Sequence, residues 1–234
     1  MEIIAEVKNL KKYYGKGDNV VRAVDGIDLQ IEKGKFTMII GTSGSGKTTF
    51  LNLLGGQDTP TEGSIVVDGM RIDTLKEAQL AVYRRNKVGF IYQNFNLIPM
   101  LNIRENILFS LDMGNQKPDM EFFHEIVRML HLENKLEAFP EELSGGQKQQ
   151  AAIARALMGK PSLVLADEPT GNLDTRTSQN VLGLLRLMNE KYHQTLVMIT
   201  HNLDIAQMAD RVIRIEDGKV VSQGERSHVF ACEQ

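Results

Sequence analysis

The ten residues 41–50, Gly-Thr-Ser-Gly-Ser-Gly-Lys-Thr-Thr-Phe, constrain the fold of this chain more than any other stretch. They fit the phosphate-loop pattern G-x-x-x-x-G-K-[ST] at every required position. The apolar run 36–40 before them is of strand type, and the run 49–54 after them reads as the first turns of a helix. A glycine-rich turn between a strand and a helix can be purely structural, but the complete match in this context favours an anion site.

The residue types at the motif positions explain how such a site would work. Gly41, Gly44 and Gly46 allow the backbone to curl so that successive N–H groups point inward, and the helix N-terminus adds partial positive charge there. Lys47 can reach the β- and γ-phosphates, and the Thr48 hydroxyl can ligate Mg²⁺. The stretch therefore predicts a nucleoside triphosphate site. Its predicted binding residues are Gly41, Ser43, Gly44, Ser45, Gly46, Lys47, Thr48 and Thr49.

Length and composition set the outer limits. A chain of 234 residues is long enough for one large α/β domain or two small ones. Its net charge of −3 gives no support for sequence-independent nucleic-acid binding. The single cysteine, Cys232, excludes an internal disulfide and fits a reducing cytoplasm. No stretch approaches 18 apolar residues, and the first residues, Met-Glu-Ile-Ile, are not a basic signal region, so work at a membrane would need another protein as carrier.

Hydrophobic periodicity predicts alternating strands and helices. The expected strands are 3–7, 24–31, 36–40, 88–92, 163–166, 195–199, 211–215 and 219–222, with a hairpin over 64–72. The expected helices are 49–54, 76–85, 102–111, 119–131, 148–158, 175–191 and 203–209. The alternation favours a mostly parallel sheet covered on both faces. The block 94–158 is helical throughout, which predicts a helical subdomain inserted into a single domain of residues 1–234.

Two further constellations carry chemistry. The apolar run 163–166 leads directly into Asp167 and Glu168. An acid at the end of a strand beside a phosphate loop can hold Mg²⁺, which we expect of Asp167, and Glu168 can then polarise an attacking water. Residues 143–147, Leu-Ser-Gly-Gly-Gln, open another helix, where Ser144 is a good N-cap and two glycines would admit a phosphate. The alternatives are acids that only end a strand before Pro169, and an ordinary capped helix.

An aromatic pair, Tyr13-Tyr14, stands in a segment expected to be a polar loop over 9–19. Such a pair most often packs between strands. Ahead of a phosphate loop, an exposed ring can instead stack on the base of the nucleotide. The residues themselves leave both readings open.

Taken together, the motifs resemble those of ATP-binding cassette (ABC) ATPases in order and rough spacing. The resemblance covers nearly the whole chain, and Leu-Ser-Gly-Gly-Gln is its specific part. The motifs are the phosphate loop, Gln93, residues 143–147, Leu-Ala-Asp-Glu-Pro-Thr at 165–170, Leu173-Asp174 and His201. The fold that this resemblance implies is α/β, with a mostly parallel core sheet, an antiparallel β subdomain and the inserted helical subdomain.

The resemblance also implies a head-to-tail homodimer that forms on ATP binding. ATP and Mg²⁺ would lie between the phosphate loop of one copy and the signature residues Ser144, Gly145, Gly146 and Gln147 of the other. Tyr14 would stack on adenine, and Gln93 would contact Mg²⁺ and the attacking water. Asp174 would stabilise the dimer interface, and His201 would sense the γ-phosphate beside the catalytic Glu168 and Lys47.

Finer details look like the branch of macrolide exporters and lipoprotein-release ATPases, which also contains cell-division and antimicrobial-peptide-resistance members. These details are residues 84–85, 89–93, 95–99 and 169–174. The branch implies a transmembrane permease as partner and a peripheral position on the cytoplasmic face of a prokaryotic membrane. The chain departs from the pattern at Gln150, where members usually carry Arg. Its segment between Gln93 and Ser144 is also a few residues shorter than usual.

We therefore expect an ATPase that powers a separate permease for export or extraction of a peptide, drug or lipid-linked substrate. The alternative is an ABC ATPase coupled to a non-transporting membrane protein in cell division or peptide sensing. A DNA-maintenance ATPase is disfavoured because only 50 residues, 94 to 143, separate Gln93 from Ser144, which leaves no room for a long coiled coil. A two-cassette translation factor would need a second set of motifs.

One loop has no role in this chemistry. Residues 94–101 carry Phe95, Leu97, Ile98 and Met100 with no obvious core to fill. They directly follow Gln93, so we expect them to form a docking surface for an amphipathic helix of the permease. The alternative is that they pack the helical subdomain onto the sheet.

Overall fold

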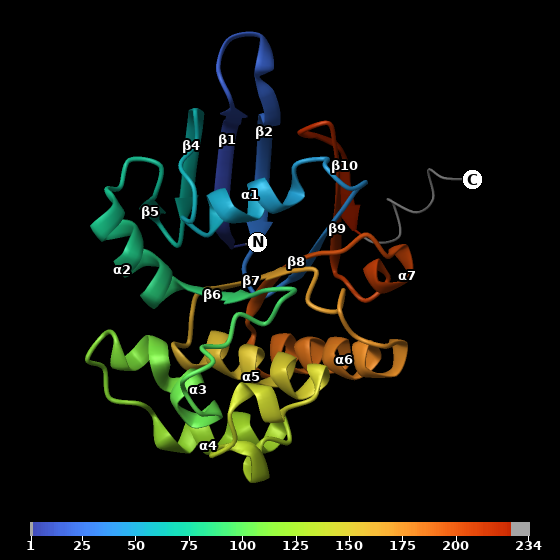
Figure 1. Cartoon of the computed structure of the whole chain (residues 1–234). Coiled ribbons are helices and arrows are strands. Elements are labelled where there is room, and N and C mark those ends of the chain that lie inside the picture. Colours follow the sequence, from blue (N-terminus) through green and yellow to red (C-terminus); the bar gives the residue numbers. More distant parts are fainter. Residues whose placement is uncertain (1, 226–234) are drawn as a thin grey trace.

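The computed structural model describes residues 2–225 (Figure 1). Cys232, on which the expectation about disulfides rests, lies outside them. Within this described range no helix combines the length and the apolar character needed to span a membrane.

Six strands form the central sheet, in the order β10–β9–β3–β8–β7–β6. They are β3 (Phe36–Ile40), β6 (Val88–Ile91), β7 (Leu163–Asp167), β8 (Thr195–Ile199), β9 (Arg211–Glu216) and β10 (Lys219–Glu225). The strands from β6 to β9 pair in parallel, and β10 pairs with β9 antiparallel. All residues of β3 and β8 are buried, as expected for strands covered on both faces. The predicted mostly parallel sheet is confirmed.

A second, antiparallel sheet contains four strands in the order β2–β1–β4–β5. They are β1 (Ile3–Tyr14), β2 (Val21–Glu32), β4 (Glu62–Val67) and β5 (Met70–Arg71). The sequence predicts a polar loop over 9–19, but β1 continues to Tyr14. Leu10 is fully buried and pairs with Ile27 of β2, and Asn9 absorbs a bulge with its φ of 44°. Pairing with β2 and β4 satisfies this polar backbone, and local composition does not reveal that pairing.

The predicted helices are all present, with ends that differ by a few residues. They are α1 (Lys47–Leu54), α2 (Glu77–Lys87), α3 (Ile103–Asp112), α4 (Met120–Met129), α5 (Gly145–Met158), α6 (Thr175–Tyr192) and α7 (Leu203–Ala206). Short 3-10 turns occur at Gly17–Asn19, Glu133–Lys135 and Pro140–Glu142. Four of the helices start at side-chain caps that accept the backbone N–H three residues later. These caps are Asn102, Asp119, Ser144 and Asp174.

Two apolar clusters cover the two faces of the parallel sheet. Met38 and Ile40 point to the cluster that contains α3, α4, α5 and α6. Ile39, between them, points to the cluster that contains α1 and the antiparallel sheet. Figure 1 shows the antiparallel sheet on one side and the helices α3 to α6 on the other. The division of residues 1–234 into a core and a helical subdomain over about 94–158 stays a prediction.

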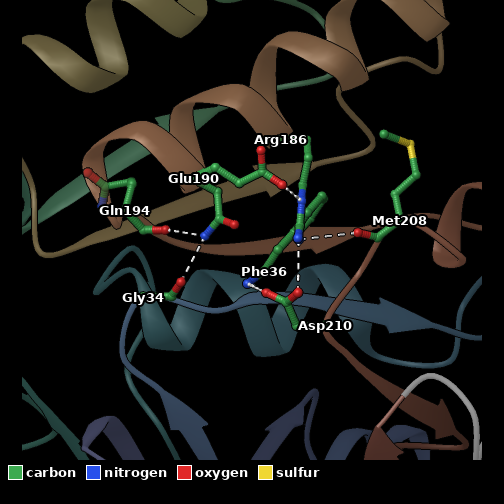
Figure 2. A network of polar contacts seen from close by, with 8 residues as sticks. Gly34, Phe36, Arg186, Glu190, Gln194, Met208 and Asp210 are labelled. Carbon is green, nitrogen blue, oxygen red and sulfur yellow. Dashed lines mark hydrogen bonds and ion pairs between the residues drawn. The ribbon is translucent and has the colours of Figure 1, made fainter.

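Side-chain hydrogen bonds tie the C-terminal half of α6 to the start of β3 (Figure 2). The carboxylate of Asp210 accepts the backbone N–H of Phe36 and the Nη1 of Arg186, each at 2.9 Å. Arg186 also donates from Nε to Glu190 at 2.7 Å. The buried amide of Asn189 donates to the carbonyls of two loops, at Gly34 and Gln194. These bonds anchor the strand from which the phosphate loop emerges.

Candidate functional site

The topology brings the ends of three neighbouring parallel strands to one edge of the sheet. β3, β8 and β7 are adjacent, and the phosphate loop follows β3. Asp167 ends β7, and His201 lies two residues after β8. Ligands of open parallel sheets bind at this carboxyl edge.

The phosphate loop needs glycine at two crowded positions. Gly41 has a φ of +151°, and a Cβ there would lie 2.1 Å from the carbonyl oxygen of Ile215. Gly46 has a φ of +100°, and its Cβ would lie 2.0 Å from the carbonyl oxygen of Ala23. Backbone from β9 and β2 therefore packs directly on the loop, which any side chain would displace.

Lys47 points its amino group into the loop. Its Nζ donates to the carbonyls of Gly41 at 2.9 Å and Thr42 at 2.6 Å, and to the Ser45 hydroxyl at 3.3 Å. Burial lowers the pKa of Lys47, and the charges of Glu168 and Asp167 oppose that shift. A cation held only by neutral oxygens in a nest of N–H groups is well placed to receive an anion.

The two acids differ in their surroundings. Asp167 accepts a hydrogen bond from the Thr48 hydroxyl at 3.2 Å, and burial raises the pKa of Asp167. Glu168 adopts a left-handed φ of 42°, and its Oε2 lies 3.2 Å from Nδ1 of His201. The structure thus places Thr48 beside Asp167 and Glu168 beside His201.

A cavity of about 800 Å³ opens over the loop. Among the residues that line it are seven of the predicted site residues: Ser43, Gly44, Gly46, Lys47, Thr48, Thr49 and Glu168. Its opposite wall is not predicted from the sequence. That wall consists of Val21, Arg22, Ala23 and Asp25 of β2, the turn Glu216, Asp217, Gly218 and Lys219, and Val221 of β10. Hydrogen bonds through Gly218 to Ser45 and Asp25 assemble this wall, and no local sequence signal marks it.

Tyr14 ends β1 with 41% of its surface exposed. Its hydroxyl donates to Asp58 Oδ2 at 2.6 Å, and the amino group of Lys12 lies 5.0 Å from its ring centroid. Burial, followed by the hydrogen bond to Asp58, raises the pKa of Tyr14. The neighbouring Tyr13 instead donates to Asp25. Asp58 and Lys12, which the sequence does not single out, therefore hold the Tyr14 ring.

The signature residues lie apart from this cavity. Ser144 and Gln147 form a reciprocal capping box at the start of α5. Gly146 packs on the start of α6, where a Cβ would lie 2.5 Å from Thr177 Cγ2, and Gly145 packs on Leu173, just before α6. Asp174 caps α6 and accepts from the Thr177 hydroxyl at 2.6 Å; bonds from Thr177 lower the pKa of Asp174. Residues 144–147 do not line the cavity over the phosphate loop.

Gln93 sits against the loop that links β7 to α6. A Cβ at Gly171 would lie 2.6 Å from Gln93 Nε2, and Gly171 donates to the carbonyl of Glu168 at 3.0 Å. Asn172 donates to the carbonyl of Gln93 at 3.2 Å and to the Asn94 side chain at 2.8 Å. Gln93 thus contacts the loop that follows Asp167 and Glu168.

The loop after Gln93 borders a groove of about 380 Å³ between α2, α3 and α5. Its apolar wall includes Val88, Phe90, Ile98 and Phe109, and its basic side chains are Arg84, Arg85 and Arg155. Met100 is 84% exposed, but Leu97 packs against the core, so the expectation that this loop has no core to fill is wrong for Leu97. Arg85 Nε is buried there with no hydrogen-bond partner.

Comparisons with known proteins agree with this geometry. A family model described as "ABC transporter" matches residues 24–171, which include the phosphate loop, Gln93, the signature and both acids. The bacitracin export ATP-binding protein BceA of Halalkalibacterium halodurans is 42% identical over 222 residues, which are 94% of this chain and 88% of that protein. The macrolide export ATP-binding/permease protein MacB of Rhodopirellula baltica is 42% identical over 92% of this chain. That match covers 32% of MacB, so the chain spans about a third of that relative.

A solved structure is also similar. It is a dimeric post-hydrolysis state of the ATP-binding cassette MJ0796 bound to ADP and Pi. Its TM-score to this chain is 0.86, at 37% sequence identity, over 94% of this chain and 98% of that one.

Proposed function

This chain belongs to the ABC transporter family, as an ATP-binding and ATP-hydrolysing subunit, and from this premise we propose that it powers a separate membrane permease by closing on a second copy of itself. The observation that carries the proposal is the separation of two anion sites. The signature residues 144–147 do not line the cavity over the phosphate loop of the same chain. A second copy can place its signature residues on the ATP that is bound at the phosphate loop of the first.

The phosphate loop binds ATP in this proposal. The N–H groups of residues 41–49 and the amino group of Lys47 receive the phosphates. The Tyr14 ring, held by Asp58, stacks on adenine. The hydroxyl of Thr48 and the carboxylate of Asp167 present neighbouring hard oxygens that fit Mg²⁺, which takes few protein ligands when phosphates supply others. Bound Mg²⁺ would neutralise charge that develops on the transferred phosphoryl group.

Hydrolysis is assigned to Glu168. Its carboxylate accepts a proton from water positioned for in-line attack, with Gln93 orienting that water. His201, 3.2 Å from Glu168, holds the carboxylate and reaches the γ-phosphate. Lys47 and the donors of Ser144, Gly145 and Gly146 from the second copy stabilise the negative charge. Gln147 orients Ser144, and Asp174 contacts the other copy.

The groove between α2, α3 and α5 is the proposed seat of the permease. Its apolar wall and three arginines fit an amphipathic helix that carries an acidic side chain. The permease would hold the chain at the cytoplasmic face of a prokaryotic membrane. Relatives named for macrolide and bacitracin export support export of an antimicrobial substrate.

The Glu168→Gln variant tests the catalytic assignment. It should bind MgATP normally but turn over roughly 10²–10⁴-fold more slowly, because an amide cannot accept the proton. Trapped with ATP, it should elute as a dimer on gel filtration, where the parent chain elutes as a monomer. Near-parental turnover would contradict the role of Glu168. Slow turnover with a monomer at saturating MgATP would contradict the shared site.

A further inference from the structure

Arg155 of α5 is a partly buried cation without an acidic partner. No carboxylate of the described residues forms an ion pair with it, and burial lowers the pKa of its guanidinium. Instead, Nη2 donates to the carbonyl of Phe95 at 2.8 Å, and Nη1 donates to the carbonyl of Asn96. One planar guanidinium therefore holds two consecutive carbonyls of the loop after Gln93.

The backbone at these two residues is strained. Phe95 has a φ of 62° and Asn96 a φ of 49°, so two consecutive L-residues adopt the left-handed region. This region is uncommon for a non-glycine residue and unfavourable for a bulky one such as Phe95. Such a conformation persists where surrounding contacts hold it. The backbone N–H groups of Phe95 and Asn96 bond the carbonyls of Tyr92 and Asn94 within the loop, and the Arg155 guanidinium binds the two carbonyls from outside it.

Other contacts hold the rest of this loop. Asn172 holds the carbonyl of Gln93, and the buried amide of Asn106 in α3 bonds both backbone groups of Ile98. Arg155 differs from these because it belongs to α5, the helix that starts at Ser144. It is thus a direct link between the signature helix and the segment that carries Gln93.

We propose that Arg155 is a positioning residue for Gln93: its guanidinium holds the left-handed turn at 95–96 and transmits displacements of α5 to the Gln93 side chain. When the signature of α5 engages the ATP of the second copy, the turn moves with α5. Gln93, two residues before the turn, would thereby be placed to orient the attacking water at its own site. The inference rests on the proposed role of Gln93.

If Arg155 only stabilised the fold, its replacement would lower the melting temperature. Partial burial of a charge without a carboxylate carries a desolvation penalty that an apolar side chain avoids. This gain offsets the loss of the two hydrogen bonds to the carbonyls of Phe95 and Asn96. Arg155→Met keeps the length of the side chain and removes the fork. We therefore expect Arg155→Met to retain the thermal midpoint of the parent while the turn at 95–96 loosens.

The test compares turnover, ATP affinity, melting and amide exchange in five purified full-length chains. They are the parent, Arg155→Met, Arg155→Lys, Gln93→Ala and the double variant of Gln93→Ala with Arg155→Met. Arg155→Met should lower kcat roughly 10- to 100-fold, as misplacement of a catalytic group does, with the affinity for a fluorescent ATP analogue unchanged. Amides of residues 95–98 should exchange faster. Arg155→Lys should remain slow, because an ammonium lacks the planar fork. Adding Arg155→Met to Gln93→Ala should cause no further loss.

Arg104→Met is the matched control. Arg104 lies on α3, and its guanidinium pairs with Glu137 and not with the carbonyls of Phe95 and Asn96, so its replacement should leave kcat unchanged. Additive losses in the double variant, or full rescue by Arg155→Lys, would overturn the inference. So would a fall in melting temperature that accounts for the lost turnover. If Arg155→Met turns over as the parent does while Gln93→Ala is slow, the inference about Arg155 is overturned and the proposed role of Gln93 stands. Parental turnover in Gln93→Ala would instead contradict the proposed role of Gln93 and the inference with it.

Discussion

Two side chains at the phosphate site, Lys47 and Asp167, have shifted pKa values in the ligand-free chain. Burial lowers the pKa of Lys47 and raises that of Asp167, so both charges are disfavoured by their surroundings. In the proposed function, bound phosphates would favour the charged form of Lys47, and Mg²⁺ held at Asp167 would favour its charged form. The charged forms of both groups cost the ligand-free protein stability, and in the proposed function MgATP would offset this cost on binding.

Asp167→Asn should stabilise the ligand-free chain at pH 7. A carboxyl whose pKa is raised on folding binds its proton more tightly in the folded state, so ionised Asp167 destabilises the fold above that pKa. The stability difference between variant and parent should shrink as pH falls through the folded pKa of Asp167. Urea unfolding at several pH values measures it. Equal stability at pH 7 would contradict the burial effect, and Mg²⁺-dependent ATP binding should be lost in the variant.

Tyr14→Ala should weaken ATP binding by about 1–3 kcal/mol, the usual effect of losing one base–aromatic stack. Tyr14→Phe retains the ring and should bind ATP nearly as the parent does, although it loses the bond to Asp58. Tyr13→Ala is the control, because the Tyr13 hydroxyl bonds Asp25 instead. Calorimetric titration with ATP decides the matter. A loss at Tyr13→Ala that equals the loss at Tyr14→Ala would argue for packing and against stacking.

At the scale of elements, helix starts in this chain have two uses. Asn102 and Ser144 form the same reciprocal capping box, with Glu105 and Gln147 as partners. At α3 the cap satisfies backbone donors within the chain. At α5 the proposed function adds a second use, in which the backbone at the two glycines after Ser144 would receive a phosphate. Only the second use needs another copy of the chain.

Replacing both caps with arginine separates these uses. Ser144→Arg and Asn102→Arg should each lose about 1 kcal/mol of stability with the cap. Only Ser144→Arg should abolish hydrolysis, because its side chain fills the space of the phosphate from the second copy. ATP affinity measured on the monomer should stay intact in both. Retained turnover in Ser144→Arg would contradict the signature assignment, as would equal losses of turnover in the two variants.

At the scale of the whole molecule, the proposed catalytic residues and the proposed docking groove lie in different places. The phosphate loop and acids follow the strands at one edge, whereas the groove lies among α2, α3 and α5. The loop after Gln93 touches both regions. In the proposed function, motion of α5 relative to the sheet would therefore displace this loop and change both the nucleotide site and the groove.

Phe109→Ser should uncouple the permease. Phe109 lines the groove and is 36% exposed. Because its surroundings in the free chain are partly open, melting and basal ATPase should change little, while copurification with the permease is lost. Phe139→Ser is the control, since Phe139 is 43% exposed and does not line the groove. Equal retention of the permease by both variants would move the docking site elsewhere.

Local patterns predict most of the elements of this chain and the residues that chemistry requires. The glycines and Lys47 specify the phosphate loop through backbone freedom and charge, and caps such as Ser144 and Asp174 specify helix starts. Strand runs such as 195–199 match the structure to the residue, because full burial on both faces leaves a continuous apolar signal. The sequence also places Asp167 at the end of a strand, whereas its hydrogen bond with Thr48 of α1 is seen only in the structure.

Only the tertiary structure decides which remote segments meet. Arg22 and Gly218 complete the cavity because β2 and the β9–β10 turn pack on the loop, and neither carries a motif. β1 extends through Tyr14 because pairing with β2 satisfies a polar backbone. Arg155 reads as one more residue of an Ala-rich helix, yet it holds the carbonyls of Phe95 and Asn96, about 60 residues away. Sequence patterns record local backbone preference and burial, whereas contacts across the fold depend on the sheet order and the crossings of helices.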